Sequence, residues 1–184
     1  MWLCTPCLAA RSVTHDLVNS SRSFHTDWAG DVILTGSEAM RFAEGLQKVL
    51  VNDETWDTVY LGRLPHELWL LSYPDSGHHG GGVPTLARVD VATAGPLLAH
   101  HAWTVTDPNL LVEFLVDRWC DRRALGPLRH ILGAWPNHGL TDGYGLLRDA
   151  LAKVRSVSRD VLDPGETELA HLAQNSIERV LHCR

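Results

Sequence analysis

The chain has 184 residues, of which 45% are hydrophobic and 21% charged, a balance that excludes wholesale disorder and fits one domain with length left for an arm. No run of about 18 or more apolar residues is present, so we expect no membrane-spanning helix and no membrane partner. The formal net charge is −6, and residues 29–107 hold ten acidic against four basic side chains, which argues against a nucleic-acid partner and suits a partner with a basic surface.

Residues 1–28 show no sustained periodicity and are predicted to form an irregular N-terminal arm. The first ten residues lack the basic start of a secretion signal. We therefore expect reduced thiols and a cytoplasmic location. Residues 29–184 are predicted to form a single α+β domain, strand-rich over 29–105 and helical over 106–184.

The strand-rich half begins with a short apolar run at 31–35. Thr35 and Glu38 have the spacing of a capping box. The helix predicted after them carries one apolar stripe, made of Ala39, Phe42, Ala43, Leu46, Val49 and Leu50. Further strands are predicted at 55–61, 66–73, 85–91 and, after a Gly-Pro break, 97–105. Because the connections are short, we expect an antiparallel sheet of three to five strands over about residues 31–105.

The helical half is predicted to begin at Asp107, a capping residue followed by proline. Its first helix, through Leu110–Trp119, is apolar over a wide arc and should be the central buried helix. Breaks at 126–127 and 136 bound a short helix, and a third helix spans about 143–157. Asp163 and the proline after it should begin the last helix. Strands followed by helices indicate an α+β fold with helices covering the sheet.

Four residues are candidate metal ligands. Cys4 and Cys7 are separated by two residues, which is half of a typical zinc site. His78 and His79 lie next to each other in a glycine-rich loop, where both side chains are free to reach one ion. A second ligand pair with standard spacing is missing for the cysteines. Zinc is therefore kept as an alternative to free thiols and solvated histidines.

The loop from His78 to Gly82 also has the composition of an esterase oxyanion-hole loop. Its usual partner, a serine in a Gly-x-Ser-x-Gly turn, is absent. Ser37 is the nearest substitute, in a strand–turn–helix setting that helix capping already explains. A serine or metal-assisted hydrolase is therefore an alternative hypothesis, and no catalytic residue is assigned.

Seven tryptophans is an unusually high number for this length. Trp69 and Trp119 have strongly apolar neighbours in the sequence and should lie in the core. Trp2, Trp28 and Trp135 lie in the arm or beside breaks. They are the candidate partner-binding anchors, because tryptophan is enriched at binding hot spots.

These observations favour a non-enzymatic interaction module. We predict a small subunit, inhibitor, immunity-type or regulatory protein that docks on another protein through aromatic anchors and an acidic surface. The metal-assisted or serine hydrolase remains an alternative. A small-molecule binding module with its ligand between sheet and helices is another.

Overall fold

The computed structural model describes residues 32–64, 67–74, 82–99, 102–136 and 141–183. Within these residues one antiparallel sheet has the strand order β1-β5-β4-β3-β2-β6. The strands are β1 (Ile33–Thr35), β2 (Gln47–Val51), β3 (Thr58–Leu61), β4 (Glu67–Ser72), β5 (Thr85–Asp90) and β6 (Thr104–Val105). The helices are α1 (Gly36–Ala43), α2 (Gly95–Ala99), α3 (Pro108–Asp121), α4 (Leu125–Ile131), α5 (Thr141–Val157), the 3-10 turn η1 (Arg159–Val161) and α6 (Pro164–His182).

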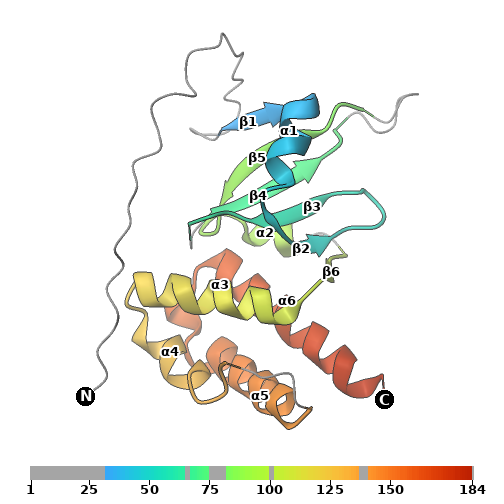
Figure 1. Cartoon of the computed structure of the whole chain (residues 1–184). Helices are drawn as coiled ribbons and strands as arrows, with labels where there is room; N and C mark the ends of the chain where they lie inside the picture. Colours follow the sequence, from blue (N-terminus) through green and yellow to red (C-terminus); the bar gives the residue numbers. More distant parts are fainter. Residues whose placement is uncertain (1–31, 65–66, 75–81, 100–101, 137–140, 184) are drawn as a thin grey trace.

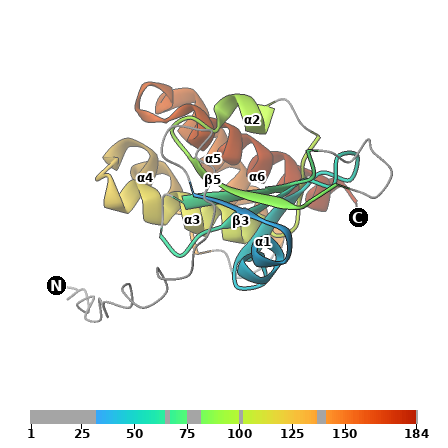
Figure 2. The same ribbon diagram turned by 90° about the horizontal axis from the view of Figure 1, so that it is seen from above.

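The sheet lies between two unequal helical layers (Figures 1 and 2). The short helix α1 crosses one face of the sheet. The helical half of the chain covers the other face, with α3 and α6 next to the strands and α4 and α5 packed behind them (Figure 1). None of the described helices is long and apolar enough to cross a membrane.

The strand sequences explain why both faces are covered. Along β4, Leu68 and Leu70 contribute to the core between the sheet and the large helical layer, while Trp69 and Leu71 belong to the smaller core under α1. Successive side chains of a strand point to opposite faces. An apolar residue at every one of these positions therefore requires a cover on each side.

The predicted α+β fold is confirmed, with corrections in its first half. The described sheet has six strands where three to five were expected. The helix predicted to continue to Leu50 ends at Ala43, and 47–51 is strand β2 instead. The strand predicted over 97–105 is divided between helix α2 and the two-residue strand β6.

Two local predictions near these strands are also wrong. Thr35 is the N-cap residue of α1, but its side chain makes no capping hydrogen bond, so the predicted capping box is not formed. The strand predicted to begin at Thr55 begins at Thr58, because residues 52–57 form a turn.

The helical half follows the sequence closely. Asp107 caps α3 by accepting a hydrogen bond from the backbone N–H of Asn109 at 2.8 Å. The core side chains of α3 are buried, Trp119 completely, which confirms the predicted central helix. The break after α3 falls at Arg122–Ala124, so the predicted break at 126–127 lies in the first turn of α4.

Four charged side chains join α3 to the start of α6, and we call them the α3–α6 charge cluster: Arg118, Arg122, Asp163 and Glu166. Arg118 donates from Nε to Glu166 Oε1 at 2.8 Å and from Nη2 to Asp163 Oδ2 at 2.6 Å. Arg122 donates to the same Asp163 oxygen. Glu166 is fully buried, and its other oxygen accepts from the backbone N–H of Asp163 at 2.9 Å, completing the predicted cap.

The cluster sets the charge state of Asp163. Burial raises the pKa of its carboxyl group, but hydrogen bonds from Arg118 and Arg122, and the charges of both, outweigh that effect. The pKa of Asp163 is therefore held below its ordinary value. The carboxylate form is the one that bridges the two helices.

The start of α6 packs closely on the chain leading into α2. A Cβ atom added to Gly165 would lie 2.0 Å from the backbone oxygen of Val91, and one added to Gly95 would lie 2.6 Å from the Cβ of Pro164. We expect Gly165→Ala to lower the free energy of unfolding by about 1–3 kcal/mol, because rigid backbone has to move apart. Urea unfolding followed by tryptophan fluorescence measures this loss.

Gly145 in α5 is the matched control. A Cβ added there meets no atom within 4 Å, so Gly145→Ala should raise stability by up to about 1 kcal/mol through helix propensity alone. A loss of similar size in both variants would show that the close contact at Gly165 is not the cause.

Candidate partner-binding site

Of the site residues predicted from the sequence, the structure describes Trp135. Its side chain is partly buried and packs against the main core, which lies between the sheet and the helical half. The other predicted residues lie outside the described part of the chain: Trp2, Cys4, Cys7, Trp28, His78 and His79. Their roles as anchors or zinc ligands remain predictions.

The described residues offer no alternative metal site. Among them, no group of three or more His, Cys, Asp and Glu side chains is arranged to hold an ion. Cys120 and Cys183 are exposed free thiols.

The most exposed aromatic ring in the described part of the chain is Trp56, at 61%. It lies in the turn between β2 and β3, residues 52–57, which we call the Trp56 turn. Asn52, at the start of this turn, is buried, with 1% of the residue exposed. Its Oδ1 accepts from the backbone N–H groups of Glu54 at 2.9 Å and Thr55 at 3.2 Å. The exposed Trp56 therefore belongs to a turn that the buried Asn52 side chain stabilises through hydrogen bonds.

The backbone of Trp56 is in the left-handed region, with φ of 63°. Large side chains seldom adopt this conformation, and strain of this kind is concentrated at functional sites. Because the turn is closed by a hydrogen bond from the backbone N–H of Asn52 to the oxygen of Asp57 at 2.9 Å, the conformation is maintained. Glycine adopts this backbone conformation without steric strain, so a tryptophan at this position lowers the stability of the fold.

Three carboxylates share the turn with the exposed indole. Asp53, Glu54 and Asp57 lie in the same six-residue turn, which contains no Lys or Arg. Asp57 accepts a hydrogen bond from the Thr55 hydroxyl at 2.8 Å. Asp53 and Glu54 are exposed. An aromatic centre with an acidic edge is suited to binding a basic protein surface.

Sequence reasoning missed Trp56 because it assigned the residue to a strand. The signal that was available is the polar run from Asn52 to Thr55. Asn and Asp side chains accept hydrogen bonds from backbone N–H groups two or three residues ahead and so favour turns over strands.

A second feature, which we call the α1 groove, lies between α1 and the turn that links β3 to β4. Its volume is about 430 Å³. Phe42 and Trp69 form its aromatic part, with ring centroids 4.8 Å apart and planes tilted by 49°. The residues that line it are Glu38, Arg41, Phe42, Gly45, Leu46, Arg63, Glu67 and Trp69.

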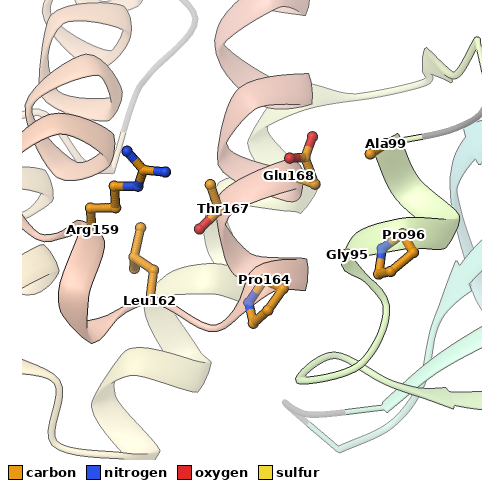
Figure 3. A pocket seen from close by; sticks show the side chains of 8 residues that line it. All are labelled: Gly95, Pro96, Ala99, Arg159, Leu162, Pro164, Thr167 and Glu168. Atoms are coloured by element: carbon orange, nitrogen blue, oxygen red, sulfur yellow. The ribbon is translucent and has the colours of Figure 1, made fainter.

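A second hollow, of about 440 Å³, lies between α2 and the start of α6 (Figure 3). Most of its lining is apolar, and Arg159 and Glu168 are its charged residues. It lies beside the close contact of Gly95 with Pro164, and the Thr167 hydroxyl donates a hydrogen bond to the backbone carbonyl oxygen of Asp163 at 3.2 Å. We assign this hollow to the packing of α2 on α6.

Residues 39–90 match the model of a protein family described as Immunity protein 27. This segment runs from α1 to the end of β5 and contains the Trp56 turn and nearly all of the α1 groove. No curated protein and no solved structure gives a significant match. The match supports the predicted immunity-type interaction module and does not identify its partner.

Proposed function

We propose that this protein is an immunity-type protein that binds a toxin protein and blocks its action, with no chemistry of its own. The observation that carries the proposal is the match of residues 39–90 to the Immunity protein 27 family. In the fold this segment contains four adjacent strands of the sheet, from β2 to β5. It is a structural unit able to present a binding surface.

The proposed mechanism is steric. Trp56 enters a pocket on the partner, and Asp53, Glu54 and Asp57 lie against a basic rim around that pocket. A buried indole supplies affinity, while the carboxylates speed the encounter and select the partner. We place this interaction in the cytoplasm, where Cys120 and Cys183 stay reduced.

The metal-assisted or serine hydrolase and the small-molecule binding module remain alternatives from the sequence. The His78–Gly82 loop lies almost wholly outside the described residues. No geometry in the described part of the chain favours either alternative over protein binding.

Growth protection tests the proposed function. An immunity protein has to be inherited with its toxin, so the products of the genes on either side of this one are the candidates. We expect one of them to arrest bacterial growth when expressed alone, and co-expression of this chain to restore growth. Light scattering after size-exclusion chromatography should then show a stable complex of the two purified proteins.

The variant Trp56→Gly should protect less well than the wild-type chain. Arg123→Gly, a change at another left-handed position far along the chain, should protect fully. The proposal is wrong if no neighbouring product is toxic, or if growth is restored without formation of a complex.

A further inference from the structure

The lining of the α1 groove contains two carboxylates, Glu38 and Glu67, and two arginines, Arg41 and Arg63. Both carboxylates of its lining have partners. Glu67 Oε1 accepts from Arg88 Nη1 at 3.5 Å, and Glu38 also has an interaction partner. Arg41 and Arg63 have no hydrogen bond or ion pair with any described residue. The two arginines are therefore the charged side chains of the lining that are left to bind a ligand.

The two arginines approach the groove from different elements. Arg41 comes from the last turn of α1, and Arg63 comes from the turn that follows β3. This turn is held by the backbone N–H of Gly62, which donates to the oxygen of Glu67 at 2.9 Å. A Cβ added to Gly62 would lie 2.5 Å from the Cβ of Glu67. The absence of a side chain at Gly62 therefore lets the end of β3 and the start of β4 approach each other closely beside the groove.

The groove also has an apolar surface. Phe42 is 43% exposed and rests on Trp69, which is 6% exposed. A guanidinium group binds a carboxylate through paired N–H donors, and an exposed aromatic ring favours contact with another apolar side chain. A ligand for this groove has to offer both groups close together.

We propose that the α1 groove binds a segment of the partner protein that carries an acidic side chain next to an aromatic or aliphatic one. This proposal rests on the proposed function and adds a second contact of opposite charge. The Trp56 turn precedes β3 and Arg63 follows it, so the two contacts lie at opposite ends of one strand. A partner with a basic patch and an acidic segment can then dock in a single orientation, because reversal brings like charges together.

A displayed peptide library tests the groove without knowledge of the toxin. Random heptapeptides on phage are selected on the full-length chain, and peptides that also bind Arg41→Gln/Arg63→Gln are removed. We expect the enriched peptides to place Asp or Glu within two positions of an aromatic or aliphatic residue. Their Kd, measured by titration calorimetry, should be about tenfold higher for the double variant, because two charge-assisted contacts are lost.

Arg148→Gln/Arg179→Gln is the matched control, since it removes the same charge from α5 and α6. Its Kd for the peptides should stay within twofold of wild type, and circular dichroism should show that all variants are folded. The proposal is overturned if no peptide is enriched, if the enriched peptides lack acidic residues, or if both double variants bind equally well. Protection from a toxin combined with failed selection would reject the groove and leave the proposed function intact.

Discussion

Arg118→Met is expected to lower the free energy of unfolding by about 3–5 kcal/mol, the cost of removing one partner from a buried ion pair. Glu166 is fully buried, and Arg118 supplies its hydrogen bond at 2.8 Å. Arg122, the remaining cation, is 3.4 Å away and more exposed. The substitution keeps an unbranched side chain of similar length, so the loss reflects charge more than packing.

Two further variants identify the cause. Arg122→Met should cost only about 1 kcal/mol, because this arginine lies at the exposed side of the α3–α6 charge cluster. Adding Glu166→Gln to Arg118→Met should recover part of the loss, since the amide removes a buried charge that has lost its closest partner and can still accept from the Asp163 backbone. Urea unfolding at 25 °C measures all three. Equal losses in Arg118→Met and Arg122→Met would contradict the assignment of the buried pair.

The effect of Arg118→Met should also depend on pH. The pKa of Asp163 is lowered in the folded chain, whereas the unfolded carboxyl group has a pKa of about 3.9. As the pH falls, the unfolded chain therefore takes up a proton first, and stability falls with it. The cluster stabilises the fold fully above about pH 5 and loses this contribution as the pH falls through the lowered pKa. The difference in the free energy of unfolding between wild type and Arg118→Met should accordingly be smaller at about pH 3 than at about pH 7.

The parts of the fold that the sequence predicts well depend on local chemistry. Asp107 and Asp163 cap their helices through hydrogen bonds to residues two or three positions away. Such contacts can be recognised from spacing alone. Burial of Trp69 and Trp119 follows similarly from their apolar neighbours.

The errors arise where distant pairing decides the structure. Residues 47–51 fit the apolar stripe of a helix, yet they pair with β3 on one side and β6 on the other. Pairing on both sides, and burial of Val49 and Leu50 against the helical layer, outweigh the helical period. The close approach of Gly165 to Val91 is also invisible in the sequence, since these residues are far apart along the chain.

The candidate site was only partly predictable for a related reason. An acidic first half and an excess of tryptophan indicate a protein partner, but they do not say which indole is exposed. Trp56 and Trp69 both occur in strand-like sequence, and they differ because Asn52 ends β2 with a turn. The availability of the two arginines in the α1 groove was likewise hidden, because it depends on which carboxylates already have partners.

Trp56→Gly is expected to weaken binding to the partner by about 30-fold or more, equivalent to about 2 kcal/mol, the threshold of a binding hot spot. The indole is the one large apolar group in an otherwise polar turn, and its exposure leaves it free to enter a pocket. Surface plasmon resonance with the purified toxin measures the change. It should lie mainly in the dissociation rate, because the nearby carboxylates that steer association are retained.

The same substitution should not destabilise the protein. Glycine adopts the left-handed backbone of residue 56 without the steric cost that tryptophan bears, and an exposed indole contributes little to the core. The free energy of unfolding should therefore stay level or rise by up to about 1 kcal/mol. Arg123→Gly is the matched control: Arg123 has φ of 56° at the end of α3, where glycine is also favoured. It should show the same change in stability with unchanged binding. If Trp56→Gly instead lowers stability and leaves affinity unchanged, Trp56 is a structural residue of the turn and the partner binds elsewhere.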